Sequence, residues 1–235
     1  MRRRKTMKAF IAEFIGVFAL VFAGVGAIHV TEGGELTAVA LAHGLAIALM
    51  ILAVGHASGG HFNPAVTFGM LITGNIKLGP AIGYWVSQFL GGLAAAALLA
   101  GLYGSEAVAK GTPAVGLGFS APQGLVAEIV LTFFLVLVIF ATALHHKLPV
   151  AAFAIGLTIV MDIMAGGAIS GAAMNPARVL APAIIGGSWA DHWIYWVGPL
   201  VGAAIAAIFY TQIYMVDEKE EAKLPVDLTS DRPSS

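Results

Sequence analysis

The tripeptide Asn-Pro-Ala occurs twice, at Asn63-Pro64-Ala65 and at Asn175-Pro176-Ala177. Asparagine is favoured just before a helix, and proline suits the first helical turn because its missing N–H would be unpaired there anyway. Each tripeptide therefore predicts the start of a helix. The capping oxygen leaves each asparagine NH2 group free to donate hydrogen bonds to a small polar molecule. Two such groups brought together would make a binding or permeation site.

The residues around the two tripeptides repeat as well. Ser58-Gly59-Gly60-His61-Phe62 precedes the first, and Ser170-Gly171-Ala172-Ala173-Met174 precedes the second at the same spacing. Other matches occur in the same order along both halves: Ala12-Glu13 with Ala127-Glu128, and Tyr84-Trp85-Val86 with Tyr195-Trp196-Val197. Chance similarity between apolar segments explains any one match but not the ordered set. The chain is therefore a duplicated unit.

The composition requires that these residues be positioned inside a membrane. Hydrophobic residues make up 59% of the 235-residue chain and charged residues only 11%, and a soluble domain of this size could not bury so much apolar surface. Six stretches approach the roughly 20 apolar residues that a bilayer requires: Ala9–Val30, Leu36–Gly55, Pro80–Tyr103, Leu125–Leu144, Pro149–Ala168 and Trp193–Met215. The first stretch is too long for a cleavable signal peptide.

Each half contains three of these stretches, so the second half must insert upside down. Residues 65–73 and 177–185 are too short to cross, and we expect two half-helices that enter from opposite faces and meet near the bilayer midplane. The predicted fold is an all-α membrane protein with six transmembrane helices and two half-helices in an inverted repeat. Residues 1–216 are expected to form one domain, with halves of about 9–103 and 122–216.

The positive charges predict the orientation of the chain. Three arginines and two lysines crowd the start of the first span, and Lys77, Lys147 and the tail charges fall on the same side. Only Lys110 lies in a loop on the other side, so both termini are expected in the cytoplasm. The tail, residues 217–235, is charged and lacks apolar periodicity, which predicts a disordered extension. The chain contains no cysteine, which excludes disulfides and thiolate chemistry.

The segments before each asparagine predict the lining of a narrow pore. Irregular backbone inside a membrane is tolerated only where protein buries it or water touches it. We expect carbonyl groups to line the pore at two matching segments, Gly59, Gly60 and His61, and Gly171, Ala172 and Ala173. Helix-breaking loops buried against their neighbours are the alternative. Arg178 would cost roughly 2.5–3.5 kcal/mol at this depth unless it faced water or a partner, so we expect it to form a cationic gate.

These residues resemble the aquaporin (major intrinsic protein) family from Glu13 to Tyr214, and within it the plant tonoplast intrinsic proteins. The segments Ser58–Gly69 and Asp191–Gly202 are near-matches to the signatures of that group. The resemblance implies a homotetramer in which each monomer has its own pore. It also implies a selectivity filter of His43, Ile163, Ala172 and Arg178, a set similar to that of tonoplast proteins that pass ammonia, urea or hydrogen peroxide besides water.

Two acids occupy matching places in the first and fourth spans, Glu13 and Glu128. Each either relays protons or accepts hydrogen bonds from unpaired N–H groups of a buried loop, and the resemblance implies the second role. Asp162 has no counterpart in the first half and stands where tonoplast proteins tend to have asparagine. It either pairs with His43 or contacts the outer loop.

The sequence therefore predicts a passive channel for water, with ammonia and also hydrogen peroxide or urea as further permeants, that excludes protons and ions. The alternative is a proton-coupled secondary transporter, which needs a titratable residue at the central site. No serine–histidine or paired-aspartate arrangement favours an enzyme, and no cofactor, metal or nucleic acid is expected. The membrane is the plasma (inner) membrane if the source is prokaryotic and the vacuolar membrane if it is a plant.

Overall fold

The computed structural model describes residues 2–215, and every element in that range is helical. Six helices are long and apolar enough to cross a membrane: α1 (Arg2–Val30), α2 (Leu36–Ser58), α4 (Leu78–Tyr103), α6 (Ala121–Ile139) with its π-helical continuation η1 (Phe140–His145), α7 (Ala151–Ser170) and α9 (Ile194–Ile213). Each of the six predicted spans is confirmed, with ends that differ by a few residues. The predicted tail lies outside the described residues, and the domain boundary at residue 216 stays a prediction.

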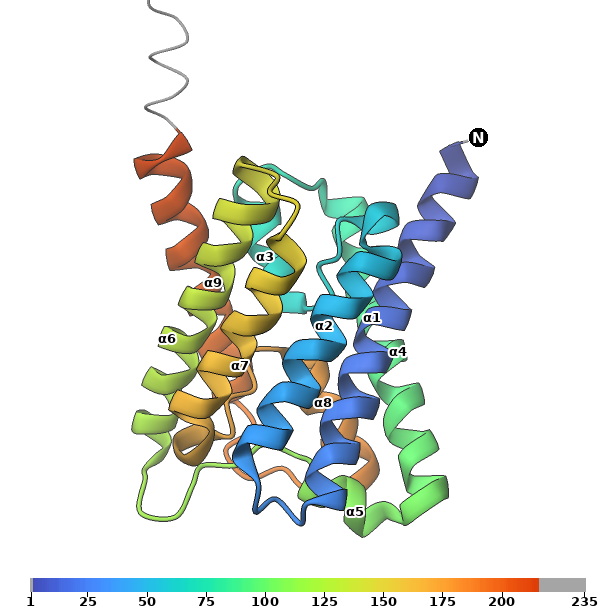
Figure 1. The fold of residues 1–235 in the computed structure, drawn as a ribbon, viewed down its shortest axis with the longest axis vertical. Coiled ribbons are helices and arrows are strands. Elements are labelled where there is room, and N and C mark those ends of the chain that lie inside the picture. Colours follow the sequence, from blue (N-terminus) through green and yellow to red (C-terminus); the bar gives the residue numbers. More distant parts are fainter. Residues whose placement is uncertain (1, 216–235) are drawn as a thin grey trace, which may run out of the picture.

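The two predicted half-helices are also confirmed, as α3 (Pro64–Ile72) and α8 (Pro176–Gly186). They enter the bundle from opposite ends, α3 from the end that holds the start of α1 and α8 from the other (Figure 1). The sequence analysis missed two elements: the short helix α5 (Ser105–Lys110) and the π-helical turn η1. The six-residue α5 is too short to show an apolar period, and a π-helical turn has no distinctive sequence pattern.

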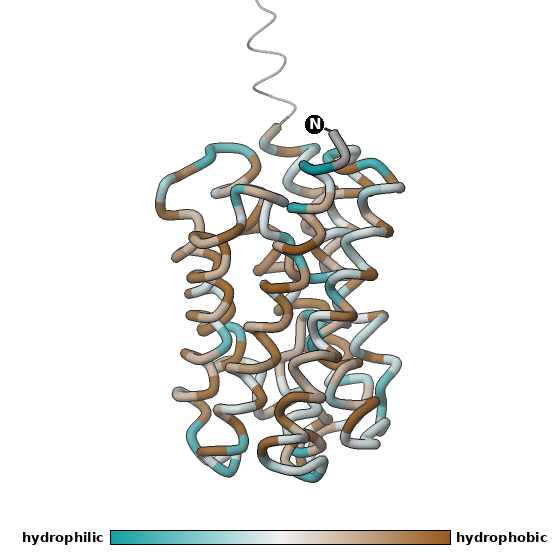
Figure 2. Tube along the Cα trace, turned by 90° about the vertical axis from the view of Figure 1, so that its right-hand side faces the viewer, coloured by the Kyte–Doolittle hydropathy of each residue, from teal (hydrophilic) through white to brown (hydrophobic). Residues whose placement is uncertain are grey.

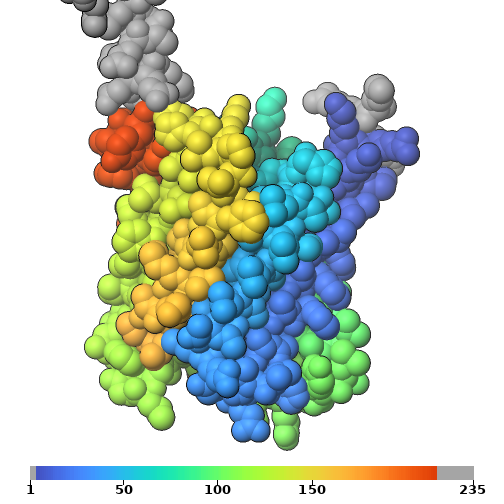
Figure 3. Space-filling view, in the orientation of Figure 1, coloured from blue at the N-terminus to red at the C-terminus, as the bar shows by residue number. Residues whose placement is uncertain are grey.

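Small residues bring the spanning helices into close contact. A Cβ atom on Gly44 of α2 would overlap the carbonyl oxygen of Gly156 in α7, and a Cβ on Gly156 would overlap that of Gly44. The repeat shows in two further contacts, Gly91 against the backbone of Phe14 and Gly202 against that of Ile129. Glycine lets membrane helices approach this closely, and α2 and α7 lie side by side on the face seen in Figure 3.

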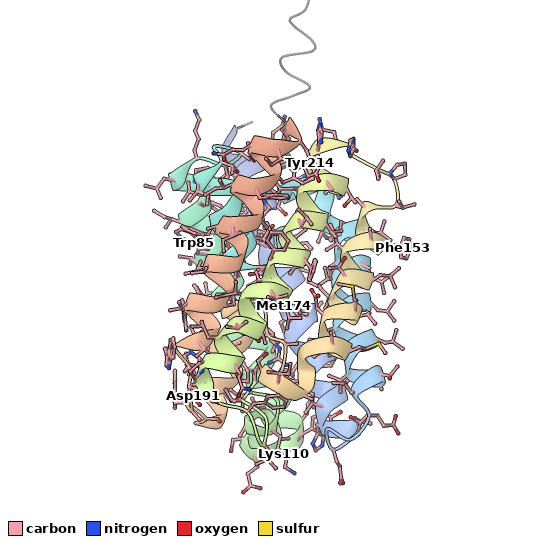
Figure 4. All side chains as sticks on the ribbon, turned by 90° about the vertical axis from the view of Figure 1, so that its left-hand side faces the viewer. Trp85, Lys110, Phe153, Met174, Asp191 and Tyr214 are labelled. Carbon is pink, nitrogen blue, oxygen red and sulfur yellow. The ribbon has the colours of Figure 1, made fainter. Side chains whose placement is uncertain are left out.

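Hydrophobic residues cover most of the length of the bundle, and hydrophilic ones concentrate at its two ends (Figure 2). Both ends of the described chain lie at one end of the bundle (Figure 1), as six crossings require. Lys110 lies at the opposite end from Tyr214 (Figure 4). The charge asymmetry predicted from the sequence therefore separates the two ends of the bundle. Which end faces the cytoplasm stays a prediction.

Candidate permeation site

Two loops turn the chain back into the bundle and position the site. α2 ends at Gly59 and α7 ends at Gly171, both with left-handed backbone (φ 93° and 79°), which glycine adopts without strain. Phe62 and Met174, at matching positions before the two asparagines, are also left-handed, with φ of 46° and 52°. Such a conformation is uncommon for residues with a side chain. Other contacts must therefore hold these loops in place.

Two buried carboxylates supply those contacts. Glu13 accepts hydrogen bonds from the backbone N–H of His61 (3.0 Å) and Phe62 (2.7 Å). Glu128 accepts them from Ala173 (2.8 Å) and Met174 (2.7 Å). Two tyrosines at matching positions complete the support: Tyr84 donates to the carbonyl of Ser58, and Tyr195 donates to that of Ser170. In both halves, these bonds satisfy buried backbone groups that no helix pairs.

The asparagine side chains cap the half-helices and also tie them together. The Asn63 oxygen accepts from Ala65 N, and the Asn175 oxygen accepts from Ala177 N and Arg178 N. In addition, Asn63 Nδ2 donates to Met174 O at 2.7 Å and Asn175 Nδ2 donates to Phe62 O at 2.9 Å.

The expectation that each NH2 group is wholly free is therefore wrong, because each amide donates one N–H to a carbonyl of the opposite loop. One N–H of Asn63 and one of Asn175 remain for a molecule in the pore.

A narrow cavity runs past both asparagines, and the space open to the centres of water-sized molecules inside it is about 30 Å³. Figure 4 shows Met174, which lines it, at mid-height in the bundle. Its other lining residues include Gly60, His61, Ala172 and Ala173 from the two loops and a largely apolar wall: Leu20, Ile47, Val66, Leu135, Ile139, Ile155 and Ile159.

Several residues predicted for the pore lie elsewhere. Gly171 lines a second cavity, called the outer cavity below, whose walls also include Leu36, Lys110 and Gly111. Gly59 lines neither cavity. It caps α2 instead, and its N–H donates to the carbonyl of Gly55. Of the two tripeptides, only the asparagines line the pore cavity. Both prolines face a separate apolar cavity between α4 and α9, since each helical position turns away from the one before it. Ala65 and Ala177 serve the asparagine caps with their backbone N–H groups.

Three of the four predicted filter residues lie at the junction of the two cavities. His43, Ile163 and Arg178 line both the pore cavity and the outer cavity, while Ala172 lines the pore cavity alone. The structure thus brings together residues from α2, α7, α8 and the second loop. A molecule that moves from one cavity to the other must pass between them.

The hydrogen bonds at this junction define the protonation of His43. Its Nδ1 lies 2.8 Å from the carbonyl oxygen of Val39, which can only accept, so Nδ1 carries the proton. Its Nε2 lies 3.2 Å from Arg178 Nη2, which can only donate, so Nε2 accepts. A neutral His43 therefore has no N–H left for a molecule in the pore. The other guanidinium nitrogen, Nη1, donates to the carbonyl of Gly111 at 2.9 Å.

Sequence reasoning missed several residues of this network. In the first half, Gln88 donates to Glu13 (2.7 Å) and to the hydroxyl of Thr67 (3.0 Å). Thr67 in turn donates to the carbonyl of Asn63, so its oxygen accepts from Nδ1 of His61. The one available signal was Gln88 itself, a polar residue in the third span. The carbonyl of Gly111 had none, because any residue carries one.

Asp162 meets neither of its predicted partners. It is 1% exposed, and no hydrogen-bond partner within the described chain reaches either carboxylate oxygen. His43 is engaged by Val39 and Arg178 instead, and Asp162 lines neither the pore cavity nor the outer one. Asp162 therefore neither pairs with His43 nor forms a hydrogen bond to the outer loop within the described chain.

Comparison with known proteins identifies the family. The family model described as "Major intrinsic protein" matches residues 1–210. The chain belongs to the major intrinsic protein family. It is therefore a membrane channel and not an enzyme. Among residues 2–215, no group of three or more His, Cys, Asp or Glu side chains is placed to hold a metal ion.

The chain is similar to plant proteins along nearly its whole length. It is 43% identical over 233 residues to "Probable aquaporin TIP1-2" of Oryza sativa subsp. japonica, covering 94% of this chain and 91% of the relative. It is 40% identical to "Aquaporin TIP2-1" of Arabidopsis thaliana, covering 89% and 88%. In fold it is similar to the X-ray structure of the aquaglyceroporin from Plasmodium falciparum, with a TM-score of 0.81, 26% identity and coverage of 91% and 99%.

Proposed function

We propose that this channel conducts water passively, in single file, through the pore cavity, and excludes protons and ions. One observation carries the proposal: two half-helices point their amino-terminal ends at one narrow cavity, each capped by an asparagine with one N–H still available. Helix amino termini carry partial positive charge. A water molecule between them accepts from Asn63 and Asn175 and turns its hydrogens outward, which interrupts a chain of proton transfers.

The selectivity filter in this proposal is His43, Ile163, Ala172 and Arg178. After its bonds to Gly111 and His43, the Arg178 guanidinium keeps one N–H on each terminal nitrogen for a permeant. Its positive charge repels cations. Ile163 and Ala172 supply no hydrogen-bonding side chain, which favours a wider and less polar opening than two polar or aromatic residues would leave.

The proposed solute range extends from water to ammonia, with hydrogen peroxide or urea as further permeants. Ammonia is close to water in size and accepts hydrogen bonds, so it can use the Arg178 donors. Urea is larger and is expected to pass slowly or not at all. The P. falciparum structure is of an aquaglyceroporin, but two features of this chain argue against glycerol as a permeant. Val179 follows Arg178, whereas the glycerol-channel subfamily is characterised by Asp after the matching Arg. The sixth span carries Tyr195-Trp196, where that subfamily has smaller or kinked residues.

We further propose that the channel forms a homotetramer with both termini in the cytoplasm. The family resemblance supports the tetramer, and the excess of Lys and Arg at the end that holds both ends of the described chain supports the orientation. The similarity to plant TIP proteins supports a vacuolar membrane for a plant source, and a prokaryotic source implies the plasma (inner) membrane.

The test is stopped-flow light scattering of proteoliposomes after an osmotic step, with a pH-sensitive dye inside the same vesicles. We expect shrinkage much faster than that of empty liposomes, without a matching proton leak. Permeability equal to that of empty liposomes in both the purified chain and the Arg178→Val variant would overturn the proposal.

The proton-coupled transporter is the competing function, and the position of the acids argues against it. Glu13 and Glu128 are bonded to the two loops, and none of Glu13, Glu128 and Asp162 lines the pore cavity. A transporter would need a proton gradient to move its solute. Ammonia and water flux measured with and without an imposed gradient separates the two functions, and we expect equal rates in both conditions.

A further inference from the structure

The imidazole of His43 occupies a position that depends on α1, a helix that supplies none of the four filter residues. The ring is only 3% exposed and is held at both nitrogens, by Val39 on its own helix and by Arg178 across the constriction. On its remaining side it lies against Gly24. A Cβ atom built on Gly24 would overlap the ring, with Cδ2 at 2.6 Å and Nε2 and Cε1 closer still.

The need for glycine at this position comes from space and not from backbone conformation. Gly24 lies inside the continuous helix α1, where its φ is outside the left-handed range that excludes other residues. Glycine inside a helix is roughly 1 kcal/mol less favourable than alanine. Gly26, two residues further along α1, has nothing within 4 Å of a built Cβ. At residue 24 the steric demand therefore comes from the His43 ring.

We propose that Gly24 is a specificity-determining residue of the constriction, the surface against which His43 rests so that the passage beside Arg178 stays open. The inference rests on the filter assigned in the proposed function. A methyl group at residue 24 would move the ring away from α1, and the open space next to the ring is the passage that it lines. The same movement would break the 3.2 Å contact between Nε2 and Arg178. The displaced ring narrows the filter, and the lost contact releases Arg178 Nη2 from its acceptor.

The experiment uses five reconstituted variants: His43→Ala alone and four glycine variants, of which the Gly26→Ala pair is the matched control. Gly24→Ala and Gly26→Ala are each made in the parent chain and in the His43→Ala background. In the parent, we expect Gly24→Ala to lower water permeability about tenfold, the lower end of what one methyl group changes in a tightly packed site. Urea or peroxide flux should fall further than water flux. Gly26→Ala should leave both unchanged. In the His43→Ala background, Gly24→Ala should have no further effect, because the ring it would strike is gone.

Thermal unfolding in detergent tests the same contact without any flux measurement. We expect Gly24→Ala to lower the unfolding temperature of the parent and to leave that of the His43→Ala chain unchanged or raised. A loss of permeability that persists in the His43→Ala background would overturn the proposal, because Gly24 would then act on helix packing alone. Equal permeability of parent and Gly24→Ala would overturn it as well. If neither the parent nor any variant conducts water, the proposed function fails. The unfolding temperatures of the single and double variants then still show whether residue 24 contacts His43.

Discussion

The two halves of the chain build the same backbone and then use it differently. Each half turns a loop with left-handed residues, holds it with one buried glutamate and one tyrosine, and starts a half-helix at an asparagine cap. The halves also exchange matching bonds, Asn63 to Met174 O and Asn175 to Phe62 O. The midpoint of the pore is therefore nearly symmetric.

The side chains at the two ends of the pore differ at matching positions. Val66 stands one residue after the first tripeptide, and Arg178 stands one residue after the second. The second half thus places a cation at one mouth, where it meets His43 of the first half, while the first half carries valine at the same point of the repeat. The duplicated scaffold therefore carries different side chains at its two ends.

The largest effect should come from removing either glutamate. Glu13→Ala and Glu128→Ala each leave two backbone N–H groups and at least one side-chain donor without their partner, at about 1–3 kcal/mol for each unpaired group. We expect both variants to lose most of their folded yield, measured by size-exclusion chromatography after extraction. If one variant stayed fully folded while the other did not, the two loops would not be equivalently supported.

Arg178→Val gives the second half the residue of the first and should have the next largest effect. We expect water flow to continue while protons or small cations leak, because the fixed positive charge at the constriction is lost. The pH-dye assay measures the leak, and Val66→Ala serves as the control at the matching position. A proton leak no greater than that of the parent would mean that the midpoint dipoles alone hold the barrier.

The double change His43→Phe with Ile163→His tests selectivity at the same mouth. It gives these two positions the Phe and His that strict water channels of animals usually carry, and it removes the acceptor that holds Arg178 Nη2. We expect ammonia permeability to fall much more than water permeability. The ratio of the two, measured on the same vesicle preparation, is the decisive quantity. An unchanged ratio would show that these residues do not form the selectivity filter.

Asp162→Asn should have the smallest effect, because Asp162 lines neither cavity. The amide keeps the shape of the side chain and removes a carboxylate that no described group pairs. We expect water permeability within about twofold of the parent and an unfolding temperature equal or higher, since a buried unpaired charge is costly. A large loss of permeability would place Asp162 in the permeation pathway.

The sequence alone determined the spanning helices, the two half-helices and their symmetry. Runs of about 20 apolar residues have one structural solution in a bilayer, and Asn-Pro starts a helix for local reasons that act within one turn. The six spans, the half-helices α3 and α8 and the inverted arrangement therefore follow from patterns in short windows. The four filter positions came from resemblance to a family and not from spacing, because His43 lies more than a hundred residues before the other three.

Only the tertiary structure decided which N–H donors of the polar side chains are hydrogen-bonded within the protein and which remain available to a permeant. The bond from Asn63 to Met174 O and the tautomer of His43 depend on segments more than a hundred residues apart. That Asp162 has no hydrogen-bond partner among the described residues depends on contacts between neighbouring helices. The demand for glycine at residue 24 has the same origin. Hydrogen bonds and steric contacts act over a few ångströms, so they become visible only once the helices α1, α2, α7 and α8 have been brought together around one pore.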